Sequence, residues 1–302
     1  MVIMGIIAKF GVEFLAQAYS NYIHQKISTE LQDKSSVAVE KIATLLKYRV
    51  KDSVIVRDAA NFASFKALEG ESTAVGYDVL EWVAYDIDSF RGDGSSPFWS
   101  GIIDKEYSKT FSAAGTLPDD VLSPGTDTTK VDNVIKALSN NKTTINDAAI
   151  YLMSSQSDVF IDYGWDGNAI TDQVHAMHPI NSDSTNVSKF KSPASNTQTL
   201  KEINAVLKDA RYKLCWTAYA IVFDPNNKKL WLYYNYQPWN GEKYSDVTDT
   251  DHKVLIMDNV STFRKRQSFG VMKIQVCTKS PLVKTADKDE EQYSVCKEKT
   301  IY

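Results

Sequence analysis

The sequence has no excess of positive charge, few cysteines and no apolar run long enough to cross a membrane. Its formal net charge is −4 at pH 7, so it lacks the electrostatic field that would gather a polyanion, and we expect no nucleic-acid partner. Three cysteines are too few for a four-cysteine metal site. The apolar run at the N-terminus ends after eight residues at Lys9, whereas a membrane-spanning helix needs about 20. By itself this run is therefore too short to span a bilayer.

The sequence also lacks the common catalytic motifs. It contains no glycine-rich phosphate loop, no Gly-x-Ser-x-Gly elbow and no His-Glu-x-x-His zinc motif. His175 and His178 are three residues apart, but no Cys or carboxylate follows at ligand spacing, so we interpret them as polar loop histidines. Asp86, Asp88 and Asp93 do not alternate as a calcium loop requires, and they predict a solvated turn. We therefore expect no catalytic residue, no metal site and no cofactor, with a hydrolase whose carboxylates have no fixed spacing as an alternative.

Residues 12–50 contain neither proline nor glycine, and their apolar positions recur at helical spacing. This pattern predicts one helix from Met1 to about Arg49, roughly 70 Å long at 1.5 Å per residue. Such a helix is far longer than the globular average, so about half of it must project from any domain. A buried core helix or a coiled-coil arm is the alternative, but no sustained heptad accompanies the pattern.

The two halves of this predicted helix differ in character. Residues 1–20 are apolar except for Lys9, Glu13 and a few small polar residues, and those two charges stand one turn apart, where they can pair. Residues 21–51 are amphipathic, and we expect them to lie on a sheet. The side chains assigned to the projecting half are Ile3, Ile6, Ile7, Phe10, Phe14 and Leu15. Those assigned to the contact with the sheet are Leu31, Ala38, Ile42 and Leu45.

Residues 52–302 have the composition of a globular domain, and their pattern is mostly that of antiparallel strands. A loop-rich region at 110–204 separates early strands from a β meander that starts near residue 214. Together with the helix this predicts an α+β fold, a long N-terminal helix packed on an antiparallel β-sheet with a loop-rich insertion. The predicted strands are Ser53–Arg57, Val79–Ala84, Leu214–Phe223, Lys229–Tyr236, Lys253–Met257, Val260–Gln267, Val271–Thr278 and one near Tyr293–Tyr302. Short helices are predicted at Lys130–Leu138 and after the capping pattern that begins at Thr144.

Aromatic residues are concentrated in the predicted hairpin of this meander. They can form a platform for a carbohydrate or peptide, but cross-strand packing is the more common role of such residues. The turn at 162–168 carries Trp and Asp, as a sugar-binding loop does, and also fits a plain glycine-hinged turn. The run Arg264–Arg266 is the densest basic stretch, but neighbouring side chains of a strand point to opposite faces, so it predicts no continuous patch. The hairpin aromatics are Trp216, Trp231, Tyr233, Tyr234, Tyr236 and Trp239.

The three cysteines fall into two classes. Cys215 lies within the apolar alternation of a predicted strand, the usual place of an inert buried thiol. Cys277 and Cys296 lie at the edges of a polar loop with too few apolar residues to hold itself in place. Because one ends a predicted strand and the other lies in the next, antiparallel pairing can bring them together if the register lets the side chains meet. We therefore expect a disulfide between Cys277 and Cys296, with Cys215 reduced.

The chain resembles type IV pilin-like proteins. An apolar projecting half-helix joined without a break to an amphipathic half is similar to the spine helix of that family, and Gly-Ile-Ile-Ala at Gly5–Ala8 is similar to its Gly-Ile-Leu-Ala segment. Residues Val254–Val260, followed by Phe263, resemble paired strands of the J-type minor pseudopilin of type II secretion. The expected disulfide is similar to the one that bounds the C-terminal region of many type IV pilins.

The resemblance implies a non-enzymatic structural subunit, a minor pilin or pseudopilin, of a type IV pilus-like or type II secretion pseudopilus filament. Its implied partners are other pilin or pseudopilin subunits and, before assembly, the inner membrane, which the N-terminal helix enters. The implied location is the bacterial inner membrane with a periplasmic globular domain, or an extracellular pilus. The family's peptidase site, with a basic leader, a Phe and a following Glu, is then expected before Met1, so that the chain is truncated or its start codon placed too late. The alternative function is a periplasmic or surface module that recognises glycan or peptide through the aromatic hairpin.

Overall fold

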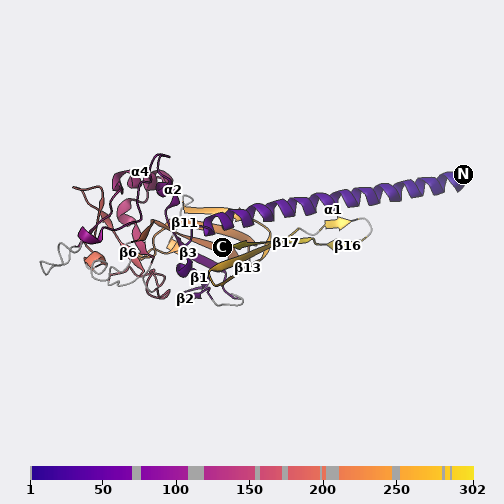
Figure 1. Ribbon diagram of the computed structural model, residues 1–302. Coiled ribbons are helices and arrows are strands. Elements are labelled where there is room, and N and C mark those ends of the chain that lie inside the picture. The colour runs from indigo at the N-terminus through magenta and orange to yellow at the C-terminus, as the bar shows by residue number, and fades with distance from the viewer. Residues whose placement is uncertain are drawn as a thin grey trace.

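The computed structural model describes residues 2–69, 76–107, 119–153, 157–171, 176–197, 199–201, 211–246, 252–280, 283–285 and 288–302. One long helix, α1 (Val2–Leu46), runs from the N-terminus into a body of sheets and loops, and its first half projects away from that body (Figure 1). The predicted α+β fold, with a long N-terminal helix on antiparallel sheets, is confirmed.

The end of α1 lies three residues before the predicted end at Arg49. The backbone of Arg49 pairs with Ala84 in an isolated bridge, and the Val50 N–H donates to the Val83 carbonyl at 2.8 Å. Those strand-like bonds replace the helical ones, and the short 3₁₀ turn Lys51–Ser53 follows. The first strand, β1 (Ile55–Asp58), therefore begins two residues later than the sequence pattern predicts.

The larger sheet is antiparallel and has the strand order β12-β11-β10-β3-β1-β2. Strand β3, near the centre of this sheet, is buried at every position, including Glu81, whose carboxylate pairs with Arg57 on β1. The neighbours of β3 come from both ends of the globular region. It pairs with β1 on one side and with β10, more than 130 residues later in the chain, on the other. The bounds are β1, β2 (Asn61–Ala67), β3 (Val79–Ala84), β10 (Thr217–Asp224), β11 (Lys229–Tyr236) and β12 (Lys253–Met257).

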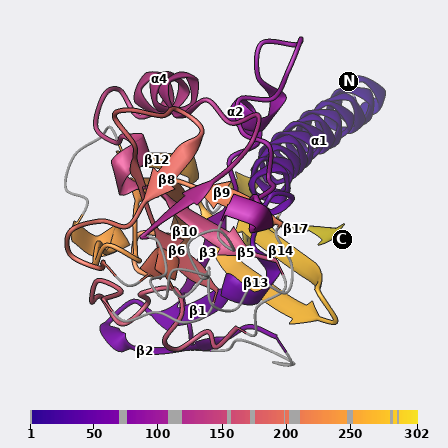
Figure 2. The same cartoon turned by 60° about the vertical axis from the view of Figure 1, so that its left-hand side comes forward.

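A second antiparallel sheet holds β13 (Val260–Ser268), β14 (Val271–Lys279) and β17 (Ser294–Ile301) in the order β13-β14-β17. The second half of α1 lies against β14 and β17 (Figures 1 and 2). One hydrophobic core fills the space between α1, this sheet and one face of the six-stranded sheet. A separate hairpin of β15 (Val283–Thr285) and β16 (Lys288–Glu291) lies between β14 and β17 in the sequence.

The insertion between β3 and β10 forms small elements around a core of its own. Its helix α4 (Thr128–Leu138) matches the prediction, and the Asp127 side chain accepts from the Thr129 and Lys130 N–H groups at its start. Thr144 and Asp147 form the predicted capping box, on the 3₁₀ turn Ile145–Asp147. The other elements are β4 (Asp120–Leu122), β5 (Ala149–Leu152), β6 (Met177–Pro179), β7 (Asn181–Ser182), β8 (Lys189–Lys191) and β9 (Tyr212–Cys215).

Two predictions in this region are wrong. The loop predicted around Asp86 contains a short helix, α2 (Ile87–Arg91), because the buried Asp86 side chain accepts from the Ser89 N–H and caps it. The strand predicted at Leu214–Phe223 is two strands, since β9 pairs with β5 in the insertion and β10 pairs with β3 in the main sheet. The chain changes sheets at Trp216.

Candidate assembly surface

The projecting half of α1 exposes large apolar side chains on several sides of the helix. Phe10, Phe14 and Leu15 are 66%, 71% and 67% exposed, and Val12, Tyr19 and Tyr22 are similarly open. Soluble proteins rarely expose such a continuous apolar surface unless it meets a partner or a membrane. Ile3, Ile6 and Ile7 lie on the described helical backbone of α1, whereas their side chains lie outside the described part of the chain. The Lys9 and Glu13 side chains are 3.8 Å apart, as predicted, and both are exposed.

We found no helix in the described part of the chain that is both long enough and apolar enough to span a membrane.

The second half of α1 is fixed to the body by its apolar face. Leu31, Ala38 and Ile42 are buried as predicted, whereas Leu45 is only partly buried, at the margin of the contact. Leu46 is fully buried instead, since residues four apart lie above one another on a helix and Leu46 continues the row of Ala38 and Ile42. Leu45 still packs against the same core from its edge.

Polar contacts add to the contact between α1 and β17. Lys299 on β17 pairs with Glu40 on α1 at 2.7 Å, and both side chains are partly open to solvent. Closer to the projecting half, the His24 ring packs edge to face on Tyr293, with centroids 4.8 Å apart, and the Tyr293 hydroxyl hydrogen-bonds to the imidazole. These contacts mark the place where α1 leaves the body.

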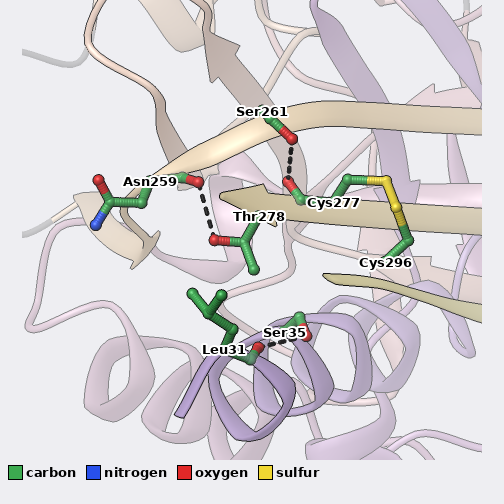
Figure 3. Close-up of a disulfide and its surroundings, with 7 residues drawn as sticks. All are labelled: Leu31, Ser35, Asn259, Ser261, Cys277, Thr278 and Cys296. Atoms are coloured by element: carbon green, nitrogen blue, oxygen red, sulfur yellow. Dashed lines mark hydrogen bonds between the residues drawn. A yellow bond between two sulfur atoms is a disulfide. The ribbon is translucent and has the colours of Figure 1, made fainter. Parts of the chain in front are cut away.

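The disulfide lies in the sheet that carries α1. Cys277 and Cys296 are directly opposite in the register of β14 and β17 and are joined, as predicted (Figure 3). Beside them, the Ser261 hydroxyl donates to the Cys277 carbonyl at 3.2 Å and ties in β13. Cys215 is a free, buried thiol, also as predicted, and burial raises its pKa. The covalent bond closes the chain segment that holds β15 and β16.

No protein-family model, curated protein or solved structure matches this chain.

A buried ion pair lies deep in the core of the main sheet. Arg57 on β1 pairs through Nε with Glu81 on β3, and these side chains are 0% and 1% exposed. The Tyr236 hydroxyl donates to Glu81 Oε2 at 3.0 Å, and Arg57 Nη2 donates to the Trp165 carbonyl at 2.7 Å. Burial raises the pKa of Glu81, and the nearby Arg57 opposes that rise. Since both groups are closed to solvent, we interpret the pair as structural.

The turn at 162–168 is part of this core. Trp165 is buried, and its Nε1 donates to the Ser53 carbonyl at 3.1 Å. Gly164 has a φ of +77°, and a Cβ there would lie 2.0 Å from the Pro238 carbonyl oxygen. The turn is therefore a glycine-dependent packing element, and its Trp offers no open face to a sugar.

The hairpin aromatics mostly pack, which agrees with the more common interpretation. Trp216, Tyr236 and Trp239 are buried, whereas Trp231, Tyr233 and Tyr234 on β11 are partly buried. They do not form one open platform, because the three buried rings face the protein interior. Lys253 lies over the Trp231 and Tyr233 rings, 4.4 and 4.8 Å from their centroids.

Replacing Trp239 tests the recognition alternative directly. Its ring is fully buried and its Nε1 donates to the Asp147 carbonyl at 2.9 Å. We expect Trp239→Ala to lower the free energy of unfolding by about 3 kcal/mol, as a large cavity does, measured by urea denaturation. The partly exposed Trp231→Ala is the control and should cost less. A Trp239→Ala protein that keeps its full stability but loses binding on a glycan array would favour the recognition function.

In the described part of the chain, no three His, Cys, Asp or Glu side chains form a group that could hold a metal ion. His178 is not in a loop, as the sequence suggested, but is buried on β6, where its Nδ1 hydrogen-bonds to the Thr199 hydroxyl at 3.0 Å. His175 lies outside the described residues. The burial of His178 could not be predicted from the sequence pattern, because β6 is only three residues long.

Proposed function

We propose that this protein is a non-enzymatic structural subunit of a type IV pilus-like or type II secretion pseudopilus filament, a minor pilin or pseudopilin. The observation that carries the proposal is the set of exposed apolar side chains on the projecting half of α1, which continues into a half whose apolar face is buried against the body. The second half of such a helix is fixed to the folded body, whereas the apolar first half, the arm, is free to pack against other subunits. The helix can therefore join subunits without any rearrangement of the body. Its partners are then other pilin or pseudopilin subunits.

Burial of the arm drives assembly in this proposal. Each large side chain on it gains about 1.5–3 kcal/mol when it moves from water into an apolar environment. Neighbouring arms in a filament supply that environment, and before assembly the inner membrane supplies it. The Lys9 and Glu13 charges one turn apart can neutralise one another in that setting.

The disulfide supports a location outside the cytoplasm. Disulfides form and persist in oxidising compartments such as the bacterial periplasm. The Cys277–Cys296 bond lies in the sheet that packs against α1. The body would therefore lie in the oxidising compartment, and the arm would lie at the membrane that bounds it. We accordingly propose the inner membrane with a periplasmic body, or an extracellular pilus, as the location.

The test replaces three exposed residues of the arm in the full chain, Phe10→Ser, Phe14→Ser and Leu15→Ser. We expect this variant to be lost from the membrane fraction and from filaments sheared off the cells, because its arm gains little from an apolar environment. Its melting temperature should stay unchanged, since these side chains are outside the core.

A matched control carries the same kind of change on exposed apolar residues elsewhere, Ile161→Ser and Val187→Ser, whose side chains are 63% and 45% exposed. This variant should stay with the membrane and filament fractions. If the arm variant fractionates like the unmodified protein, or if both variants are lost to the same extent, the proposed function is wrong.

A further inference from the structure

The two-residue turn between β13 and β14, Phe269–Gly270, presents an aromatic ring to solvent. The Phe269 side chain is 97% exposed, and both turn residues have a positive φ, +49° for Phe269 and +71° for Gly270. Asn or Gly is favoured at such positions, because a bulky side chain is strained there. A strained residue that keeps its ring in water points to a function for that ring outside the fold.

Side chains from two other segments hold this turn in place. Glu69 accepts from the Phe269 N–H at 2.5 Å, and Arg49 Nη2 donates to the Gly270 carbonyl at 2.7 Å. Arg49 is itself buried, and Gln267 Nε2 donates to Glu69 at 2.9 Å. A turn that is already ordered loses little conformational freedom when its ring binds, and rigid aromatic residues of this kind dominate the affinity of many interfaces.

A groove that can accept such a ring lies between α1 and β12, which is an edge strand of the six-stranded sheet. The volume of the groove is about 470 Å³. A cavity of about 150 Å³ already holds benzene, so the groove has room for a phenyl ring. Its apolar walls include Val37 on α1 and Leu255 on β12, whose side chains are 68% and 40% exposed. Both would gain free energy if a ring from another molecule covered them.

The turn and the groove carry opposite charges that form no ion pair within the described part of the chain. The side chain of Lys51 is exposed and lies beside the turn. Asp33 and Asp258 are exposed and line the groove. The cation that lines the groove, Lys34, already pairs with Glu30 at 2.9 Å. The turn therefore offers a positive charge and the groove two negative ones.

The turn cannot enter the groove of its own molecule. It is bonded to Arg49, beyond the end of α1 at Leu46, whereas the groove lies beside Val37. Val37 and Leu46 are about 14 Å apart along the helix at 1.5 Å per residue, which is farther than a phenylalanine side chain reaches. Only a second molecule can bring the two surfaces together.

We propose that the Phe269 turn of one copy inserts its ring between α1 and β12 of a second copy, with Lys51 facing Asp33 and Asp258. A contact between two different surfaces of identical chains repeats head to tail and builds rings or open helical filaments. The setting rests on the proposed filament function, but the contact itself does not use the apolar arm.

Charge reversal on each side tests this contact. The turn variant is Lys51→Glu, and the groove variant is Asp33→Lys with Asp258→Lys. The full chain is studied in dodecyl maltoside micelles, which cover the apolar arm, by sedimentation velocity at low ionic strength. We expect the unmodified chain to self-associate, and each variant alone to associate at least about tenfold more weakly, since like charges then face each other. An equimolar mixture of the two variants should associate again, because every turn then finds a groove of opposite charge.

Phe269→Asn separates binding from folding. Asn tolerates a positive φ better than Phe, so this variant should melt at least as high as the unmodified chain. It should nevertheless associate at least about tenfold more weakly, because the inserted ring is gone. A ring with a purely structural role would lose stability and association together. The control is Ile161→Asn, at a residue of the insertion that is 63% exposed, and it should associate like the unmodified chain.

The proposal is overturned if the unmodified chain stays monomeric, if either charge reversal or Phe269→Asn leaves association unchanged, or if the mixture does not recover. It is also overturned if Phe269→Asn loses stability along with association, or if Ile161→Asn loses association equally. Because micelles replace the partners of the arm here, failure of this contact leaves the proposed function standing. Failure of that function is read instead from the fractionation of the arm variant.

Discussion

Ile42→Asp is expected to lower the free energy of unfolding by about 5 kcal/mol. Ile42 is fully buried where α1 meets both sheets, in the same cluster as Trp82 and Ile274. A carboxylate there would lose its hydration without gaining a partner, and the cavity left by the missing apolar atoms adds to the cost. A change of that size consumes a large part of the stability of an ordinary domain. Urea denaturation followed by tryptophan fluorescence measures it.

The control for this prediction lies on the same helix. Phe14→Asp places the same charge at a position that is 71% exposed, and it should leave the unfolding transition unchanged. The pair of variants separates the two halves of α1, because both introduce one carboxylate into one helix. If Phe14→Asp also destabilises the body, the first half of α1 contributes to the fold and is not free for assembly.

The elements that could be predicted from the sequence have signals within one short stretch of chain. The periodicity of α1, the alternation of β11 and the turn residues between β10 and β11 each identify a structure without knowledge of distant residues. The disulfide could be predicted because Cys277 and Cys296 lie in neighbouring predicted strands around a polar loop, but the register that places them opposite each other is a property of the sheet. In the candidate site, the exposure of Phe10 and Phe14 follows from excess helix length alone.

The features that could not be predicted depend on pairing between distant segments. The break at Trp216 exists because β5, some 65 residues earlier, takes β9 as a partner. Arg266 lies opposite Lys273 only because of the β13 and β14 register, and Lys273 pairs in turn with Glu298 on β17 at 2.8 Å. The partial exposure of Leu45 depends on how α1 is rotated about its axis against the sheet. Helical spacing in the sequence identifies the buried face, but it does not decide between neighbouring residues such as Leu45 and Leu46 at the edge of that face. No local pattern reports these relations.

The buried ion pair of the main sheet gives the second large effect, and it is equally non-local. Arg57→Met is expected to cost about 4 kcal/mol, because it leaves the Glu81 carboxylate buried without its cation and the Trp165 carbonyl without a donor. Glu81→Gln should cost a similar amount, since the guanidinium then lacks a counter-charge. The double variant should cost less than the two single costs together, because neither charge remains unpaired. If the cost of the double variant equals the sum of the two single costs, the interaction between Arg57 and Glu81 contributes nothing to stability.

The free energy of unfolding of these variants should also depend on pH. Burial already raises the pKa of Glu81, and removal of Arg57 takes away the charge that opposes this rise. A carboxyl group whose pKa is higher in the folded than in the unfolded state holds its proton more tightly when folded, so its protonation favours folding. Its contribution is complete below the unfolded pKa and is lost as pH rises through the folded pKa. Arg57→Met should therefore gain stability as the pH falls from neutrality toward the unfolded pKa of a glutamate, relative to Arg57→Met with Glu81→Gln, in which the titrating group is absent. Parallel stability curves for these two proteins across that range would contradict the assignment of the buried charge to Glu81.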